Sequence, residues 1–303
     1  MANPAYVAVD WGTSSFRLWL IGRDGTVLAE RRSGEGMTSA AKTGFSAVLA
    51  GHLAAIEAPE NLPVIVCGMA GARQGWVEAG YIDVPAPLAS ILTGAVSVPG
   101  ESRDIRILPG LAQRDIATPD VMRGEETQLI GALGRASSGA QAVCMPGTHS
   151  KWVHVTDSKV TGFSTFMTGE LFDVISKHTI LSHAVAGAEE QPADAAAFEA
   201  AVAAAFARPA LASNLLFAAR SGQLLHGISA AAAQARLSGT LIGLEIAGAL
   251  QDAATGITLV ASGRLQALYE QAFKTLSLAF TAIDADAAVR RGLSAAAEAI
   301  WPN

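Results

Sequence analysis

The chain has 303 residues, half of them hydrophobic and 16% charged, with 21 Lys and Arg against 27 Asp and Glu. A chain of this length and apolar content is not disordered, and it favours two domains of about 150 residues each. The net charge of −6 argues against a nucleic-acid partner, because neutralising phosphates requires a clustered basic surface.

The longest apolar runs are too short to cross a membrane. Val64–Ala70 runs into Gly71, and Leu241–Leu250 is interrupted by Glu245. A spanning helix needs about 20 apolar residues. The sequence therefore predicts no membrane-spanning segment.

The beginning of the chain and its cysteines indicate the cellular compartment. Met1–Tyr6 carries no basic segment and does not resemble a signal peptide. Cys67 and Cys144 are the two cysteines, which is too few for a disulfide framework or a cysteine-based metal site. We expect a cytoplasmic protein.

Alternating apolar residues and turn residues predict several elements in the first half of the chain. The expected strands are Ala5–Asp10, Phe16–Ile21, Thr26–Glu30, Leu62–Cys67 and Arg106–Leu108, and the expected helices are Thr38–Ile56 and 124–136.

A second series of strands begins near residue 142 and resembles the first. The expected strands are Ala142–Met145, Lys151–Val155, Val160–Thr165 and Ile257–Ala261, with long Ala-rich helices after Leu171. In both series a strand is followed by Gly-Thr-x-Ser and then by another strand, which indicates an internal duplication. We expect two related lobes, residues 1–137 and 138–303.

The two Gly-Thr turns suit a phosphate ligand. Glycine lets the backbone approach a ligand closely, and the N–H groups and hydroxyls can surround phosphate oxygens. Asp10, at the end of the first strand, could hold Mg²⁺ directly or through water. The alternative is that both are ordinary hairpin turns whose hydroxyls satisfy backbone N–H groups. The candidate phosphate-binding residues are Gly12, Thr13, Ser14, Gly147, Thr148, His149, Ser150 and Lys151.

Several strings resemble a known family. Asp10–Thr13 resembles the first phosphate motif of the sugar kinase/actin superfamily, and Pro146–Trp152 resembles the second motif of the 2-dehydro-3-deoxygalactonokinases. Further strings similar to that family are Gly68–Trp76, Pro109–Leu111, Met122–Gln128, Phe166–Phe172 and Leu237–Gly239.

The resemblance implies an α/β, two-lobed, actin-like ATPase (ribonuclease H-like) fold with duplicated lobes and a central ATP cleft. It implies ATP- and Mg²⁺-dependent phosphorylation of the terminal (6-) hydroxyl of 2-dehydro-3-deoxy-D-galactonate, in galactonate breakdown. One position departs from the superfamily pattern, because Met145 stands where an Asp is usual. His149 and Lys151 could supply charge to the transferring phosphoryl group instead.

Glu125 and Glu126 are the candidate catalytic acids, together with Asp10. Adjacent residues on a helix point about 100° apart, so only one glutamate can face the substrate. An acid at a helix N-terminus is also favoured by the helix dipole without any catalytic role. The Glu-Glu-x-x-Leu-Ile string resembles the catalytic acid region of exopolyphosphatases. This resemblance favours a catalytic role over a purely structural role at the helix N-terminus. We expect Glu125 to be the base or to orient a water or metal, with Glu126 as the alternative.

The candidate substrate residues follow predicted strands. Arg73 and Gln74 lie after a buried strand, where open α/β sheets place ligands, and an Arg there could hold a carboxylate. A solvated Arg and a packing Trp76 are the alternative. Arg17 could contact the substrate or pair with an acid, and Thr168 could be a helix N-cap. The complete substrate-binding set is Arg17, Arg73, Gln74, Trp76, Thr165, Thr168 and Glu170.

Gly263 is the candidate adenosine-binding residue, because in the superfamily a glycine at such a turn lets adenosine lie against the backbone. An N-cap by Ser262 is the alternative reading of this turn. His178 and His183 lack ligand spacing, so a metal held by protein ligands alone is not expected. A homodimer is possible. The rival functions are a kinase for another small sugar or sugar acid, and an actin-like protein that binds ATP or hydrolyses phosphoanhydrides.

Overall fold

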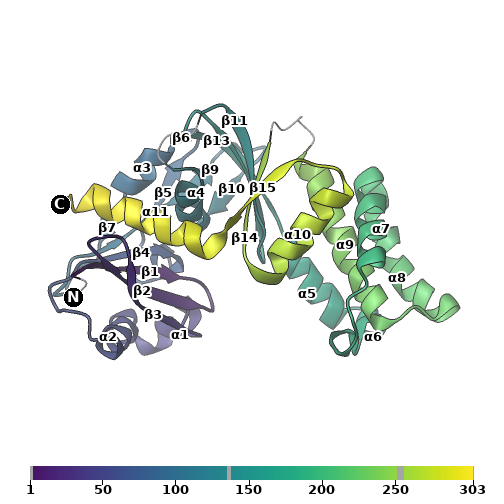
Figure 1. The fold of residues 1–303 in the computed structure, drawn as a ribbon, viewed down its shortest axis with the longest axis horizontal. Helices are drawn as coiled ribbons and strands as arrows, with labels where there is room; N and C mark the ends of the chain where they lie inside the picture. Colours follow the sequence, from purple (N-terminus) through teal and green to yellow (C-terminus); the bar gives the residue numbers. More distant parts are fainter. Residues whose placement is uncertain (1–2, 135–137, 251–255, 303) are drawn as a thin grey trace. The chain divides into compact units, whose positions relative to one another are not determined.

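The computed structural model describes residues 3–134, 138–250 and 256–302 (Figure 1). Contacts divide the chain into two compact units. Unit 1 comprises Met1–Gly139, Val155–Phe163 and Asp284–Asn303, and unit 2 comprises Ala140–His154 and Ser164–Ile283.

Unit 1 is built on a mixed sheet with the strand order β3-β2-β1-β4-β8-β7. Its strands are β1 (Pro4–Trp11), β2 (Phe16–Gly22), β3 (Val27–Ser33), β4 (Val64–Gly68), β7 (Val96–Ser97) and β8 (Ile105–Ile107). A smaller sheet has the order β10-β9-β5, with β5 (Tyr81–Asp83), β9 (Gly110–Gln113) and β10 (Asp120–Met122). The helices are α1 (Met37–Thr43), α2 (Phe45–Ala55), α3 (Leu88–Thr93), α4 (Glu125–Leu133) and α11 (Ala285–Ile300), with the short η1 (Met69–Gly71).

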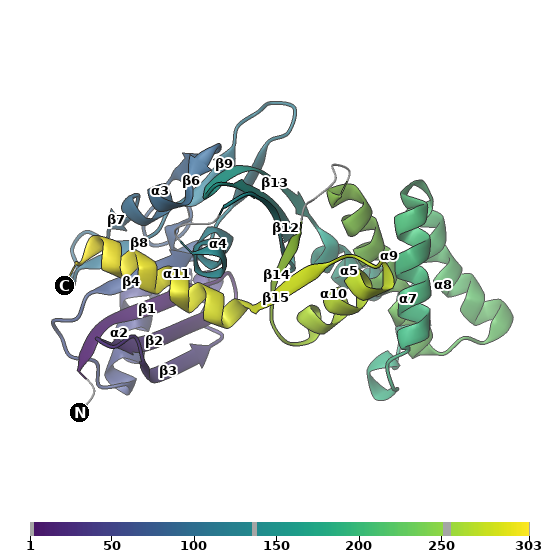
Figure 2. The ribbon, with the colours of Figure 1, turned by 45° about the horizontal axis from the view of Figure 1, so that its top comes forward.

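The two faces of β1 carry different side chains because successive residues of a strand point in opposite directions. Val7, Val9 and Trp11 pack in one core cluster with Phe45 of α2. Asp10 belongs to the opposite face, where α11 contacts β1 and β4. In Figure 1 the sheet lies between α2 and α11, and Figure 2 shows α11 beside α4. The alternation therefore turns the Asp10 carboxylate towards the N-terminal end of α11.

Unit 2 repeats the strand order of unit 1. Its strands β11 (Ala140–Met145), β12 (Ser150–Thr156), β13 (Lys159–Phe166), β14 (Ile257–Ala261) and β15 (Phe280–Asp284) follow the order β15-β14-β11-β12-β13. In unit 1 the corresponding order is β8-β4-β1-β2-β3, and β11 pairs parallel with β14 as β1 does with β4. The duplicated-lobe, two-lobed α/β fold is thus confirmed. The outer end of the β12–β13 hairpin belongs to unit 1, where β13 pairs with the short strand β6 (Ala86–Pro87).

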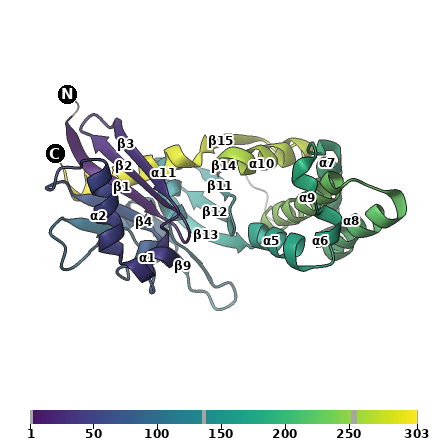
Figure 3. The same cartoon turned by 90° about the horizontal axis from the view of Figure 1, so that it is seen from below.

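Helices cover the sheet of unit 2 and extend beyond it. They are α5 (Thr168–His178), α6 (Ser182–Val185), α7 (Ala195–Ala207), α8 (Ala212–His226), α9 (Ala230–Ala249) and α10 (Gly263–Thr275). Small residues let α7 and α9 approach closely: a Cβ added at Gly239 or Gly243 would lie 2.5 Å from a backbone oxygen of α7. Figure 3 shows α9 beside α7 and α8. The Ala- and Gly-rich composition is therefore used for tight helix packing.

Two expected helices differ from those observed. Thr38–Ile56 is broken into α1 and α2 at Gly44, whose φ of 94° is outside the helical region. The helix expected over 124–136 is α4, which ends at Leu133, and residues 135–137 lie outside the described residues.

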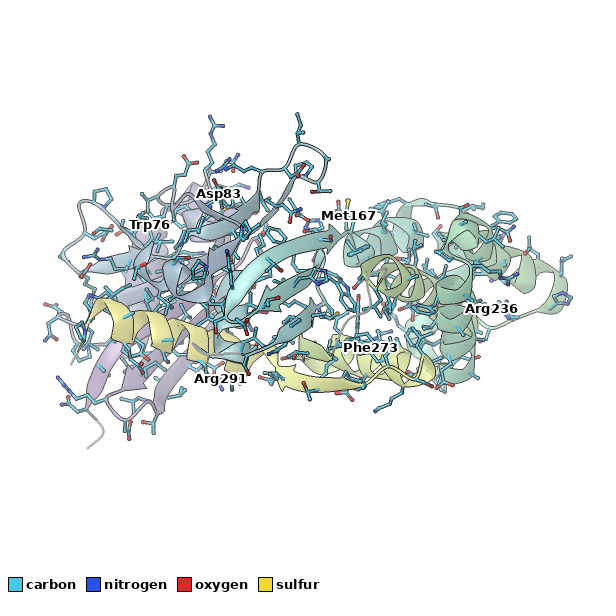
Figure 4. All side chains as sticks on the ribbon, turned by 90° about the horizontal axis from the view of Figure 1, so that it is seen from above. Trp76, Asp83, Met167, Arg236, Phe273 and Arg291 are labelled. Atoms are coloured by element: carbon cyan, nitrogen blue, oxygen red, sulfur yellow. The ribbon has the colours of Figure 1, made fainter. Side chains whose placement is uncertain are left out.

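The end of the chain, Asp284–Asn303, belongs to unit 1. The boundary expected from the sequence, between residues 137 and 138, placed it in the second lobe. α11 packs directly against α4: a Cβ added at Gly131 would lie 1.8 Å from the Ala288 oxygen, and one at Gly292 would lie 1.9 Å from the Thr127 oxygen. Arg291, labelled on α11 in Figure 4, donates a hydrogen bond from Nε to the Gly131 oxygen at 2.7 Å. Two glycines far apart in sequence create this contact, and a local reading of the sequence cannot pair them.

Within the described part of the chain, no single helix is both long and apolar enough to cross a membrane. Ala195–Ala207 and Pro209–His226 pass a length and composition test only as a pair, and the two segments are bent by 114°.

Candidate active site

The first Gly-Thr turn joins β1 to β2 in unit 1. The Gly12 N–H donates to the Ser15 oxygen at 2.8 Å, and the Gly12 and Thr13 oxygens accept from Met37 and Thr38 at the start of α1. The side chains of Thr13 and Ser14 are exposed. The turn is therefore fixed through its carbonyl groups, while its hydroxyls face solvent.

Asp10 and Arg17 face each other across β1 and β2. Arg17 Nη2 lies 2.5 Å from Asp10 Oδ2, and its Nη1 forms an ion pair with Asp286 of α11. Of the two roles expected for Arg17, the structure shows pairing with acids. Burial raises the pKa of the Asp10 carboxyl, and the positive charge of Arg17 opposes that rise. Cys67 donates from Sγ to Asp10 Oδ1 at 3.7 Å.

The two candidate catalytic glutamates begin α4. Gly124 has a φ of 108°, which a glycine adopts readily, and a Cβ added to it would lie 3.5 Å from the Gly68 Cα. Since Gly68 ends β4, beside the end of β1, this approach brings the start of α4 to the strand ends where Asp10 lies. Glu125 and Glu126 each accept a hydrogen bond from the turn before the helix, from the Arg123 N–H at 3.1 Å and the Gly124 N–H at 2.7 Å.

Glu125 and Glu126 differ in burial. Glu126 is fully buried and also accepts a hydrogen bond from Thr127 Oγ1 at 3.1 Å. Burial, reinforced by the neighbouring charge of Glu125, raises the pKa of Glu126 to about 8. Glu125 is partly exposed. Of the two glutamates, the expected base Glu125 is therefore the partly exposed one.

The loop after β4 carries Arg73, Gln74 and Trp76. Arg73 and Gln74 are exposed, and neither makes a hydrogen bond or ion pair within the described residues. Trp76 stacks on Phe45 with ring centroids 6.0 Å apart and meets Trp11 edge-on at 5.9 Å. Trp76 therefore packs into the core and anchors the loop, which presents Arg73 and Gln74 to solvent.

Arg123 lies beside this loop and was not assigned a role from the sequence. Its guanidinium stacks over Tyr81 at 4.5 Å and donates from Nη2 to the Gly80 oxygen at 2.7 Å. Its Nε and Nη1 are buried and have no hydrogen-bond partner among the described residues. Arg123 belongs to the Met122–Gln128 string, so the family-like motif included this residue. Nothing in the sequence showed that its guanidinium would be buried.

The second Gly-Thr turn joins β11 to β12 in unit 2, and the first turn of α5 packs against it. The Glu170 N–H donates to the Thr148 oxygen at 3.0 Å, and a Cβ added at Gly169 would lie 2.5 Å from the Gly147 oxygen. His149 and Glu170 pair at 2.5 Å. Thr148 and His149 are exposed at the turn.

Four other candidate residues of unit 2 are buried or partly buried. Ser150 is fully buried, with its Oγ 3.2 Å from the Tyr269 hydroxyl. Thr168 is buried as the first residue of α5, so it is not the N-cap, a position that Met167 occupies. Lys151 is 4% exposed. Thr165 lies near the end of β13 and is partly buried.

An apolar cavity of about 220 Å³ lies beside the second turn, within unit 2. Its lining includes Gly147 and Gly169 at the turn, Ser238 and Leu241 of α9, and Leu265 of α10.

α10 begins at Gly263, whose φ is 61° and around which a Cβ would meet nothing within 4 Å. Ser262 occupies the N-cap position but forms no side-chain capping bond. The backbone at Gly263 is therefore open to a neighbouring group.

The described residues contain no group of three or more His, Cys, Asp or Glu that could hold a metal ion. A divalent cation at Asp10 would need further ligands from phosphate oxygens and water, which is the usual coordination of Mg²⁺ in phosphoryl-transfer sites.

The chain is similar to known sugar-acid kinases along nearly its whole length. The family model described as 2-keto-3-deoxy-galactonokinase matches residues 10–296. A Rhizobium meliloti (strain 1021) protein named "Probable 2-dehydro-3-deoxygalactonokinase DgoK1" is 66% identical over 98% of both chains. The Escherichia coli (strain K12) 2-dehydro-3-deoxygalactonokinase is 37% identical over 97% of this chain and 98% of its own.

A crystal structure shares the fold. It is that of a candidate 2-dehydro-3-deoxygalactonokinase from Sinorhizobium meliloti, with a TM-score of 0.95 and 65% identity over 98% of this chain and 100% of that chain.

Proposed function

The chain belongs to the 2-keto-3-deoxy-galactonokinase family and is a kinase of carbohydrate metabolism. From this premise we propose that it transfers the γ-phosphoryl group of ATP to the terminal (6-) hydroxyl of 2-dehydro-3-deoxy-D-galactonate, in the cytoplasm. Both named relatives carry that substrate in their names.

Unit 2 fits the nucleotide. The cavity beside Gly147 is lined mainly by apolar side chains of α5, α9 and α10, and a flat, weakly polar adenine ring suits such a lining. The open backbone at Gly263 lets a ribose or base approach without meeting a side chain. The Gly147–His149 turn, with the exposed hydroxyl of Thr148, would bind phosphate oxygens. Lys151 remains the proposed source of positive charge in this unit.

Unit 1 carries the residues that would bind phosphate oxygens and Mg²⁺. Thr13 and Ser14 offer exposed hydroxyls, and Gly12 lets the backbone come close to a phosphate. Asp10 is the carboxylate that would hold Mg²⁺, directly or through water, with Arg17 fixing its orientation. When bound, Mg²⁺ neutralises charge on the phosphates.

Glu125 is the proposed general base. As the hydroxyl oxygen of the sugar acid bonds to the γ-phosphorus, the bond from that phosphorus to the β,γ-bridging oxygen breaks, and the hydroxyl proton passes to the Glu125 carboxylate. ADP leaves with the bridging oxygen. Arg73 would hold the sugar-acid carboxylate through paired N–H donors, and Gln74 would bond its hydroxyls.

The observation that carries the proposal is the pair of matched turns, one in each repeated lobe, with Asp10 and Glu125 at the same strand ends of unit 1. The test is ADP release from ATP with a panel of 2-dehydro-3-deoxy sugar acids and plain sugars. We expect strong stimulation by the galactonate derivative. ADP release that no acceptor stimulates would favour the ATP-hydrolysing rival, and preference for a plain sugar would favour a different sugar kinase.

A further inference from the structure

A buried carboxylate in unit 2 accepts hydrogen bonds from β12, α10 and α5, and the last two of these elements line the cavity. Glu245 lies on α9 and is 1% exposed. Its Oε1 accepts from Trp152 Nε1 of β12 at 2.8 Å, and its Oε2 accepts from the Tyr269 hydroxyl of α10 at 2.6 Å. The Thr168 hydroxyl of α5 also hydrogen-bonds to this carboxylate.

All of these partners are neutral hydrogen-bond donors. Burial raises the pKa of Glu245, and the hydrogen bonds from Thr168, Tyr269 and Trp152 oppose that rise. Burying a carboxylate costs free energy unless its oxygens are hydrogen-bonded. The hydrogen bonds therefore fix the position of the carboxylate and also the positions of the donor side chains. An apolar residue in place of Glu245 would leave the buried Trp152 N–H and Tyr269 hydroxyl without this acceptor, so the loss of the carboxylate would be felt at these donors.

The donors are the residues next to the nucleotide site. Trp152 follows the second Gly-Thr turn on β12, and Ser150, between them, hydrogen-bonds to Tyr269. Thr168 precedes Gly169, which packs on Gly147. Tyr269 and Thr168 themselves line the cavity. The carboxylate thus joins the turn, the first turn of α5 and the cavity wall on α10.

We propose that Glu245 is a positioning residue for ATP. Glu245 holds the second Gly-Thr turn and the walls of the adenosine cavity in their relative positions. The inference rests on the proposed nucleotide site. Glu245 lies behind the cavity walls and acts through Trp152, Thr168 and Tyr269.

The test compares Glu245→Met with Glu245→Gln. Met keeps the length of the side chain but accepts no strong hydrogen bond, whereas a Gln oxygen can still accept from Trp152, and its amide can donate to the Tyr269 hydroxyl. We expect Glu245→Met to raise both the Kd and the KM for ATP by about tenfold or more, with the KM for the sugar acid changed less than twofold. Glu245→Gln should recover most of the ATP affinity.

The control for a general loss of packing is Ile246→Val, which alters the next residue of α9 at a fully buried position. This variant should lower the thermal midpoint and leave the ATP constants unchanged. If Glu245→Met changes the constants for ATP and the sugar acid equally, or changes neither, the positioning role is wrong.

A further variant tests whether the cavity binds the nucleotide, independently of the role of Glu245. Leu265 lines the cavity and is 41% exposed, so Leu265→Trp should fill the cavity without disturbing the core. Loss of ATP binding in Leu265→Trp, with normal binding in Glu245→Met, would overturn the role of Glu245 alone. Normal ATP binding in Leu265→Trp would show that the nucleotide lies elsewhere.

Discussion

Glu125 and Glu126 are neighbours in sequence, yet they accept hydrogen bonds from different backbone groups and differ in exposure: Glu126 is buried, and Glu125 is partly exposed. Because the raised pKa of Glu126 keeps its carboxyl group protonated at neutral pH, a glutamine is a close mimic of it. The same replacement at Glu125 removes a base.

We therefore predict that Glu125→Gln lowers kcat by about 10²- to 10⁴-fold, while Glu126→Gln lowers it less than about fivefold. The measurement is steady-state ADP release at saturating substrates, with the Kd for ATP as the check on binding. Full activity in Glu125→Gln with loss in Glu126→Gln would exchange the two roles.

Glu126 also predicts how stability depends on pH. Its folded-state pKa of about 8 lies above the value of an unfolded glutamate, so the folded protein binds one more proton between about pH 4.5 and 8. Stability contributed by this group is present below that window and is lost as the pH rises through it, at about 1.4 kcal/mol per pH unit at most.

Thermal midpoints of the wild type and Glu126→Gln, measured from pH 5 to pH 8, check this effect. The midpoint of the wild type should fall relative to that of the variant as the pH rises, because glutamine has no proton to lose. A constant difference between the two proteins would show that Glu126 does not titrate in this range.

Arg73→Ala should raise the KM for the sugar acid about tenfold or more and leave the KM for ATP unchanged. Arg73 is exposed, so its removal should not change the thermal midpoint. Arg114→Ala is the control, because Arg114 is an exposed arginine of unit 1 that pairs with Asp83, and it should change neither constant. If Arg73→Ala behaves like Arg114→Ala, another group holds the carboxylate.

Gly263→Ala should weaken ATP binding through the backbone that it strains. Its φ of 61° is unfavourable for alanine by about 1 kcal/mol. The control is Gly256, which has a φ of 66° and equally open surroundings. Gly256 comes immediately before strand β14, and Gly263 comes after it. Both Ala variants should lose similar stability, and Gly263→Ala alone should raise the KM for ATP. Equal ATP constants in the two variants would remove Gly263 from the adenosine site.

The sequence predicted what depends on local pattern. The repeated strand–turn–strand segments around Gly12 and Gly147 led to the duplicated fold, and the strand order confirms it. The return of α11 to unit 1 was missed because it depends on contacts of Gly131 and Gly292, which are 161 positions apart.

The candidate site was predictable to the same extent. The turn residues and the position of Arg73 after a strand follow from local signals. The pairing of Arg17 with Asp286 and the donors around Glu245 depend on tertiary packing. Glu245 had one sequence signal, as the single charge in an apolar run, and that signal showed burial without showing what the charge contacts.

The central claim is phosphoryl transfer to a terminal sugar-acid hydroxyl, and a ³¹P spectrum of the products formed from ATP and 2-dehydro-3-deoxy-D-galactonate tests it most directly. The account predicts ADP and an equal amount of a phosphomonoester whose phosphorus couples to the two protons of the terminal CH₂ group. Inorganic phosphate in place of that ester, or an ester at another carbon, would contradict it.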